Sequence, residues 1–240
     1  MGNELMNYLN RRMKNENPFE KGKLATAGPV ITISREVGCG GIKLAKKLAC
    51  RLNEQRFLDD WRVLSKEIFY KSATELEMDT EHVMRIFTDS DKYTFEEIIK
   101  AFNNKNFKSE RRITNTVKEV IRSCAVEGFA IIVGRAGHIV ASDIKNAFHI
   151  RLTAPFDYRI NVVQGKYNFT RDKAIEYITR VEQERIAFRN AFNDNKLNPD
   201  NFDIVLNRAS YTDDNIVDII ENAIDKKGIL SDAKHKVQYY

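Results

Sequence analysis

The chain has 240 residues, enough for one domain or two and for a full hydrophobic core. Apolar residues make up 42% and charged residues 30%, and the 4 prolines and 11 glycines exclude a collagen-like or low-complexity chain. Cys39, Cys50 and Cys124 form no C-x-x-C pair, so neither a disulfide framework nor a zinc site is indicated. The net charge of +5 is too small and too dispersed to favour a nucleic-acid groove, but it suits a protein that handles small anions.

The N-terminal part of the chain is polar. Residues 1–14 lack the apolar core of a signal peptide, and no stretch approaches the roughly 18 apolar residues of a membrane span. We therefore expect a soluble, cytoplasmic protein. Residues 1–28 are rich in asparagine and are predicted to form a loosely held arm, so the globular domain is expected to begin at Pro29.

The first elements of the domain are a strand, a glycine-rich loop and a helix. Val30–Ile33 is a continuous β-branched run, which is typical of a strand buried on both faces of a parallel sheet. Gly38, Gly40 and Gly41 follow, and the apolar residues of 44–52 then recur at helical spacing. This succession is the opening of a βαβ unit.

The middle of the chain is expected to hold a second strand and a long helical region. Residues 56–58 have the pattern of the second strand, which would end at Asp59. From residue 61 onward the pattern is helical as far as Gly128, where a helix C-cap is expected. Within that stretch, residues 70–108 are rich in charge and are predicted to be a mobile helical insertion.

The rest of the chain alternates strands with helices. Residues 129–133 and 148–152 are apolar runs that predict two further strands, and 203–206 predicts a last, short one. Thr170 and Thr212 are placed to cap the helices that follow them. Strands alternating with helices predict a three-layer α/β fold with a parallel, doubly wound sheet.

Polar residues follow several of these strands, at the edge of the sheet where open α/β folds bind their ligands. Ser34–Gly41 follows the first strand, Asp59 the second, and Arg135 the strand at 129–133. In the first segment, glycines allow backbone N–H groups to approach an anion, and the next helix directs its positive end to the same place. The segment therefore predicts a phosphate-binding loop, with a tight strand-to-helix turn as an equally good explanation of the glycines.

The residues after the first strand carry a family resemblance. Ile31–Glu36 together with Gly38–Gly41 resembles the opening motif of the cytidylate kinase-like family, a branch of the P-loop nucleoside monophosphate kinases. The likeness continues in three later segments, Phe57–Asp59, Ile132–Arg135 and Asp203–Asn207. It implies five parallel strands with flanking helices, a monophosphate-binding subdomain, a mobile lid, and phosphoryl transfer from ATP to CMP or dCMP with Mg²⁺.

The resemblance also assigns parts of the chain. It implies a domain over residues 29–224, with the insertion 70–108 on the acceptor side, a lid in 180–200 and a tail at 225–240. The residues that it implies for binding the nucleotide phosphates are Ser34, Gly38, Cys39, Gly40, Gly41, Ile42 and Lys43.

The acceptor residues follow from the same resemblance. In true cytidylate kinases a glycine-arginine pair touches the cytidine nucleotide, and Gly134 and Arg135 match it. Asp59 matches their aspartate after the second strand, so it is expected near the acceptor and as a ligand of Mg²⁺, besides being a candidate helix N-cap. A structural ion pair is the alternative for Arg135. Ala136 stands where that family has an aspartate.

Phosphoryl transfer requires positive charge around the moving group. The standard pattern G-x-x-x-x-G-K-[ST] is absent, because Arg35 stands at its first glycine and Gly41 at its lysine. Arg35 is the preferred substitute cation, and Lys43 is the other candidate unless it belongs to a solvated helix face. Arg185 and Arg189 lie four residues apart and are predicted to act from the lid as catalytic arginines beside Arg35, with i,i+4 ion pairs as the alternative.

The sequence thus predicts a cytoplasmic kinase that binds ATP with Mg²⁺ and a small phosphorylated or hydroxyl acceptor, with neither a nucleic acid polymer nor a membrane as partner. A nucleotide-binding or regulatory protein without catalytic activity is the main alternative, because the loop lysine is missing. A kinase for another small metabolite on the same fold is the third possibility.

Overall fold

A computed structural model describes residues 27–55, 59–65, 68, 71–72, 110–193, 198, 201–231 and 233. Most of the predicted arm, the strand predicted at 56–58 and nearly all of the insertion at 70–108 lie outside these described residues. Among the helices that are described, none is long and apolar enough to cross a membrane.

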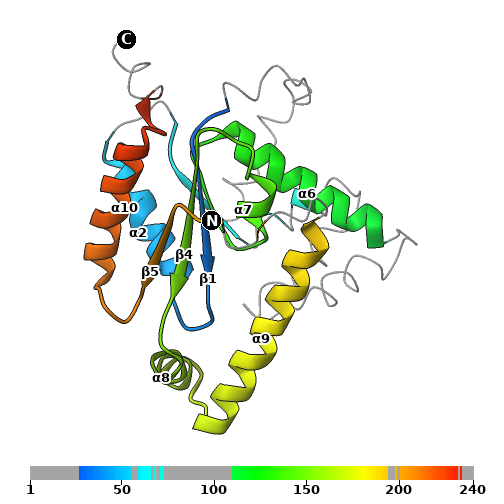
Figure 1. The fold of residues 1–240 in the computed structure, drawn as a ribbon, viewed down its shortest axis with the longest axis vertical. Coiled ribbons are helices and arrows are strands. Elements are labelled where there is room, and N and C mark those ends of the chain that lie inside the picture. Colours follow the sequence, from blue (N-terminus) through cyan, green and yellow to red (C-terminus); the bar gives the residue numbers. More distant parts are fainter. Residues whose placement is uncertain are drawn as a thin grey trace.

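Five strands form one parallel sheet, as predicted. Their order across the sheet is β2-β3-β1-β4-β5 (Figure 1). The strands are β1 (Val30–Arg35), β2 (Arg62–Leu64), β3 (Ala130–Val133), β4 (Ala147–Thr153) and β5 (Ile204–Asn207). The register pairs Val30 of β1 with Ala130 of β3 and with Ala147 of β4, so the carboxyl ends of the central strands meet at one edge.

Helices cover both faces of the sheet (Figure 1). On one face lie α2 (Gly41–Asn53) and α10 (Asp213–Lys227), and on the other lie α6 (Glu110–Glu127), α7 (Gly137–Val140) and α9 (Arg171–Phe192). Each face has its own apolar core, because alternate residues of the buried strands point to opposite sides. The three-layer α/β architecture is confirmed.

The helix ends follow the local signals in the sequence. Thr170 and Thr212 cap α9 and α10, each accepting a hydrogen bond from the backbone N–H three residues later. Gly128 ends α6 with a φ of 80°, the left-handed conformation that favours glycine. Helix α2 differs, since its N-cap is Gly40, which has no side chain to occupy the first N–H groups.

A helical hairpin stands apart from the sheet. It consists of α8 (Phe156–Tyr167), which was not predicted, and the first half of α9. The hairpin has a small core of its own, and Val37 of the glycine loop is buried in it. Residues 180–192 continue α9 up to the main core, and most of 194–200 lies outside the described residues, so the lid at 180–200 stays a prediction.

The start of the predicted helical region is wrong. Residues 62–64, which were expected to be helical, form β2, and they pair with β3 from Ala130 to Ile132. Asp59 therefore precedes the described strand and does not follow it. In a parallel sheet this puts Asp59 at the amino edge, opposite to the edge at which Arg35 and Arg135 emerge.

Candidate functional site

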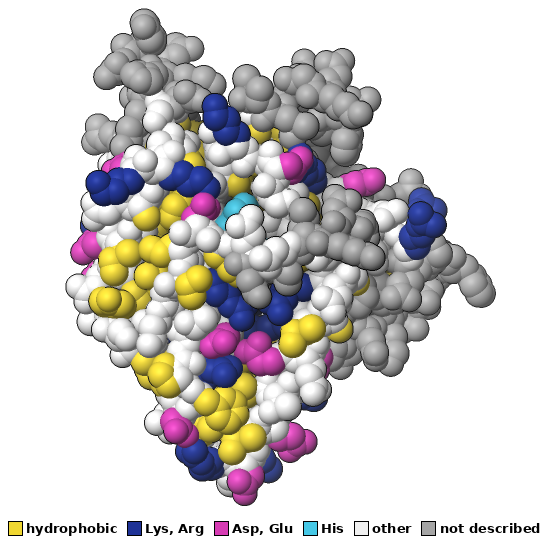
Figure 2. Space-filling model, viewed as in Figure 1, with side chains coloured by type: hydrophobic (Ala, Val, Ile, Leu, Met, Phe, Trp, Pro, Cys, Tyr) yellow, Lys and Arg dark blue, Asp and Glu magenta, His cyan; other side chains and the backbone are white. Residues whose placement is uncertain are grey.

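A cavity of about 410 Å³ opens at the carboxyl edge of the sheet, between the glycine loop and α9. Its lining is rich in basic side chains, namely Arg35, Lys43, Arg135, Arg151, Lys166, Arg185 and Arg189. Three carboxylates also line it, Glu36, Glu182 and Glu184. Figure 2 shows Lys and Arg side chains gathered with Asp and Glu side chains in the middle of this face. The balance of charge favours an anionic ligand.

The glycines of the loop have different surroundings. A Cβ atom at Gly38 would lie 3.0 Å from the Cα of Arg159, so Gly38 lets the backbone of α8 approach the loop. Gly40 has a φ of 62°, and the nearest atom to a Cβ there would be Nη2 of Arg208 at 4.0 Å. Space is therefore open beside Gly40, which is the exposed residue of the loop.

The open N-terminus of α2 faces this space. The first backbone N–H groups of a helix have no partner inside the helix, and Gly40 offers them no side-chain cap. Gly41, Ile42 and Lys43 line the cavity together with Gly40. An uncapped helix N-terminus beside open space is an arrangement that favours an anion, so the phosphate-binding loop stays a prediction that this geometry allows.

Arg35 lies between the glycine loop and the turn after β3. A Cβ atom at Gly41 would be 3.1 Å from its Cγ, and one at Gly134 would be 2.0 Å from its Nη1. The guanidinium thus occupies the position where a side chain of residue 134 would stand. Arg35 therefore brings a cation across from the loop to the predicted acceptor side, next to Gly134.

Arg185 reaches the loop from α9. Its Nη1 donates to the backbone carbonyl of Arg35 at 3.0 Å. Desolvation lowers the pKa of Arg185, while Glu182 acts in the opposite direction without forming an ion pair with it. Among the described residues no carboxylate is paired with this guanidinium, although an anionic partner is what a desolvated cation requires.

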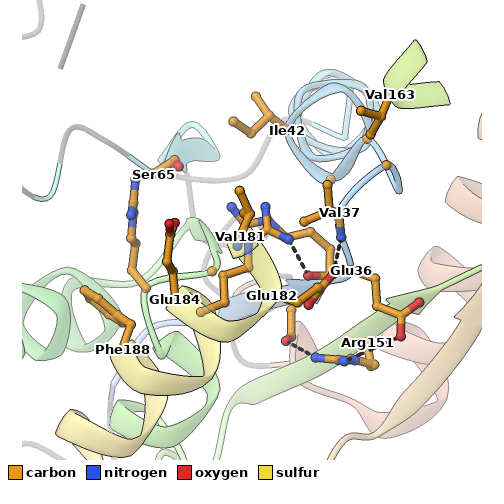
Figure 3. A pocket seen from close by; sticks show the side chains of 18 of the residues that line it. Glu36, Val37, Ile42, Ser65, Arg151, Val163, Val181, Glu182, Glu184 and Phe188 are labelled. Carbon is orange, nitrogen blue, oxygen red and sulfur yellow. Dashed lines mark hydrogen bonds and ion pairs between the residues drawn. The ribbon is translucent and has the colours of Figure 1, made fainter. Parts of the chain in front are cut away.

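The carboxylates beside the loop are bound by other groups. Glu182 accepts the backbone N–H of Val37 at 2.6 Å and pairs with Arg159 at 3.3 Å. Glu36 accepts the N–H of Ala154 at 3.1 Å and also lies near Arg159, at 3.5 Å. Figure 3 shows Glu182 projecting from α9 toward Val37. These contacts fasten the loop to the α8–α9 hairpin.

The turn that carries Arg135 has a left-handed backbone at three successive residues. The φ angles of Gly134, Arg135 and Ala136 are 73°, 55° and 53°. The strain at the two non-glycine residues is offset by the N–H of Gly137, which donates to the carbonyl of Gly134 at 2.9 Å. Arg135 lines the cavity from this turn, and Ala136 is buried.

Asp59 does not line the cavity, because β2 begins after it. The place expected for Asp59 is taken by Ser65, which follows β2, is buried and lines the cavity. Asp59 therefore does not fit a Mg²⁺ ion held at the glycine loop. In the described part of the chain, no three His, Cys, Asp or Glu side chains gather into a metal site.

Two other residues predicted at the loop are Lys43, which has an acidic partner, and Cys39, which is buried. Lys43 is 82% exposed at its side chain and pairs with Asp213 at 3.0 Å. It lines the rim of the cavity from a solvated helix face. Burial, with a smaller contribution from Glu36, raises the pKa of the Cys39 thiol to about 11, so this thiol is protonated at neutral pH.

The structure brings most predicted site residues into one cavity. They are Ser34, Arg35, Gly38, Gly40, Gly41, Ile42, Lys43, Arg135, Arg185 and Arg189. Ser34 is engaged by Arg151, whose Nη1 donates to its Oγ at 3.0 Å. Arg151 was missed, although a charged residue within the apolar run of β4 was a signal for it. Glu182 and Ser65 were missed too, and no local pattern marks them.

Solved structures provide one comparison. The chain is 22% identical to an uncharacterized protein from Eubacterium ventriosum ATCC 27560, over 82% of this chain and 98% of that one, with a TM-score of 0.55. Shikimate kinase from Bacteroides thetaiotaomicron is 11% identical over 85% and 98%, with a TM-score of 0.44. APS kinase CysC of Mycobacterium tuberculosis, solved with AMPPNP and APS, is 11% identical over 83% and 98%, also at 0.44.

None of the curated proteins compared with the chain matches it. A family model gives a firmer result, because the model of the cytidylate kinase-like family matches residues 30–210. This match begins at β1, contains every residue that lines the cavity and ends just after β5. The resemblance that the loop motif suggested is confirmed, and the chain belongs to the cytidylate kinase-like family.

Proposed function

We propose that the protein is a phosphotransferase that moves the γ-phosphoryl group of ATP to CMP, dCMP or a similar nucleoside monophosphate. The observation that carries the proposal is the guanidinium of Arg185. It is desolvated, donates to the carbonyl of Arg35, and has no carboxylate partner among the described residues.

A desolvated cation without a counterion is unfavourable, because a hydrogen bond to a carbonyl replaces only part of the hydration that burial removes. An anion in the cavity would restore the balance. The open N-terminus of α2 provides N–H donors for the same anion. Together these groups suit a phosphate chain that lies along the loop, with its terminal phosphoryl group near Arg185.

Phosphoryl transfer requires the protein mainly to position the two substrates and to stabilise the charge of the transferred group. An oxygen of the acceptor phosphate forms a bond to the γ-phosphorus while the bond from that phosphorus to the β–γ bridging oxygen breaks, which leaves ADP. Negative charge moves across the γ-oxygens during this step. Arg185 and Arg35 are the cations placed to stabilise that charge, and Arg189 follows on the same helix.

The acceptor side of the proposal rests on Arg135 and on family membership. Arg135 lines the cavity from the turn after β3, across Arg35 from the loop. A guanidinium there offers a planar fork of donors that fits a phosphate or a base edge. We assign no described residue as a ligand of Mg²⁺. Phosphate oxygens of the nucleotide are among the preferred ligands of this ion and would hold it.

A non-catalytic nucleotide-binding protein is the second candidate, and a specific observation favours it. Gly41 stands where the loop lysine is expected, and Lys43 is paired with Asp213 on the rim. Such a protein would bind ATP through the same loop without transferring its phosphoryl group.

The test is ADP formation from ATP and Mg²⁺ with a panel of acceptors: CMP, dCMP, other nucleoside monophosphates, and small alcohols. We expect ADP only when an acceptor is present, and most of it with CMP or dCMP. The control is Arg171→Gln, which removes an exposed arginine paired with Asp157 away from the cavity and should behave as wild type. ATP binding without ADP from any acceptor would support the non-catalytic candidate, and ADP with alcohols alone would point to another metabolite.

A further inference from the structure

Arg208 stands beside the glycine loop, although it comes from the far end of the domain. Its backbone N–H donates to Thr153 of β4 at 2.8 Å, which fixes its place directly after β5. Its Nε donates to the backbone carbonyl of Cys39 at 3.0 Å. Its Nη2 is the atom nearest to the open position beside Gly40, at 4.0 Å from a Cβ placed there.

The guanidinium of Arg208 is nearly buried and incompletely satisfied. The side chain is 9% exposed. Nη2 is paired with Asp213, but Nη1 is buried and has no hydrogen-bond partner among the described residues. A buried donor without an acceptor is unfavourable, so such a group in a folded protein calls for an explanation.

We propose that Arg208 is the substitute cation of the glycine loop, which fixes the loop through Cys39 and supplies positive charge to the phosphate chain of the nucleotide over Gly40. The inference rests on the proposed function and names the residue that replaces the missing lysine on the donor side. A phosphate over Gly40 would face the N-terminus of α2 and the guanidinium of Arg208 together, so helix dipole and full charge act on one anion.

The neighbours of Arg208 keep it in this place. Asp213 lies in the first turn of α10 and binds both Arg208 and Lys43. Hydrogen bonding from Arg208 is the main cause that lowers the pKa of Asp213, so the carboxylate stays charged at neutral pH. Asp213 therefore orients the guanidinium. Its negative charge near the loop also repels an anionic ligand.

These two partners give a test with opposite expectations. Arg208→Gln removes the cation, and Asp213→Asn removes the carboxylate that holds it. Both variants lose the Arg208–Asp213 ion pair, and Asp213→Asn also loses the pair with Lys43, so both should lower the melting temperature, Asp213→Asn by at least as much. The affinity for inorganic tripolyphosphate, measured by calorimetry, should fall roughly 10- to 100-fold in Arg208→Gln, the range for losing a charged hydrogen-bonding partner. It should be unchanged or higher in Asp213→Asn.

Tripolyphosphate isolates the phosphate chain from the nucleoside, and ATP is measured beside it. Arg208→Gln should weaken both ligands by the same factor, and Arg208→Lys should recover part of the loss, because the charge remains while the Nε contact is lost. Arg171→Gln is the matched control, since it breaks an exposed arginine–aspartate pair elsewhere.

The outcomes separate this inference from the proposed function. If the wild-type protein binds neither tripolyphosphate nor ATP, the proposed function fails and this inference fails with it. If the wild-type protein binds both ligands and Arg208→Gln binds them equally well, the inference about Arg208 is wrong while the proposed function stands. Equal weakening in Arg208→Gln and Asp213→Asn would assign the pair a structural task and overturn the inference as well.

Discussion

Gly38 and Gly40 contribute to the loop for different physical reasons. Gly38 is needed because the backbone of α8 lies against it, with the Cα of Arg159 3.0 Å from where a Cβ would stand. Gly40 is needed for its φ of 62° at the N-cap of α2, and the space beside it is open. The space beside the Cα of Gly40 is therefore open to a ligand, whereas the corresponding space at Gly38 is filled by α8.

The substitution Gly40→Val tests this assignment. The protein should fold with a loss of roughly 1–2 kcal/mol, because a β-branched residue is strained at positive φ. ATP binding should be lost, because the side chain fills the space that a phosphate would take. Circular dichroism checks the fold and calorimetry the affinity; a folded variant with wild-type ATP affinity would show that the loop does not hold phosphate.

Arg135 is expected to act on the acceptor alone. Arg135→Ala should weaken acceptor binding or turnover by about 2–4 kcal/mol, the order expected for a charged partner in a desolvated site. ATP affinity should barely change, and Arg135→Lys should restore only part of the loss because the fork geometry is missing. Steady-state kinetics with each substrate varied separates these effects. A loss confined to ATP would reverse the two sides of the site, and a lower melting temperature alone would favour a structural ion pair.

The rule that ligand-binding residues follow the strands of an open α/β sheet predicted residues close in sequence to a strand or a glycine. Arg35 and Arg135 lie where that rule placed them, at the carboxyl edge of the sheet. It failed for Asp59, because the second strand was assigned to residues that precede β2. Glu182 and Arg208 could not be predicted, since their contacts to the loop join residues 145 and 169 positions apart.

Among the secondary-structure elements, helix α8 of the α8–α9 hairpin was not predicted from the sequence. Only Ile160 and Val163 are buried in α8, so its apolar residues do not form a visible helical stripe. Helix α9 was recognised because Thr170 is placed to cap it. Caps are local signals, whereas the small core that holds the hairpin forms only after both helices meet.

The hairpin offers a prediction on stability. Gly165 lies inside α8 with nothing within 4 Å of a Cβ placed on it. Gly165→Ala should therefore raise the free energy of unfolding by about 0.5–1 kcal/mol, because alanine has the higher helix propensity and meets no obstacle. Urea denaturation measures this difference. A destabilised variant would show that α8 is not a regular helix at that point.

The whole molecule should lose stability in mild acid through a histidine in the centre of the sheet. His149 of β4 is buried, and its Nδ1 lies 2.8 Å from Oγ1 of Thr32 in β1. Burial lowers the pKa of His149 to about 4, with Asp203 opposing the shift and Lys227 adding to it. Between about pH 6.5 and 4, His149 therefore binds a proton in the unfolded chain but stays neutral in the folded chain.

The free energy of unfolding should consequently fall as the pH drops from about 6.5 to 4, by up to roughly 3 kcal/mol from this group. Urea denaturation at pH 7 and pH 4.5 measures the change. The matched variant His149→Gln keeps a polar partner for Thr32 but cannot titrate, so its stability should depend less on pH over this interval. An equal pH dependence in both proteins would mean that His149 is not the group responsible.

The central claim is that the cavity at the glycine loop binds the phosphates of a nucleotide, with Arg185 as their buried partner. The most direct measurement is ATP affinity in wild type and in Arg185→Gln, together with the melting temperature of each. Because Arg185 has no carboxylate partner among the described residues, we expect its removal to leave the melting temperature equal or higher while ATP affinity falls roughly 10- to 100-fold. A variant that melts earlier and binds ATP as tightly as wild type would contradict the account.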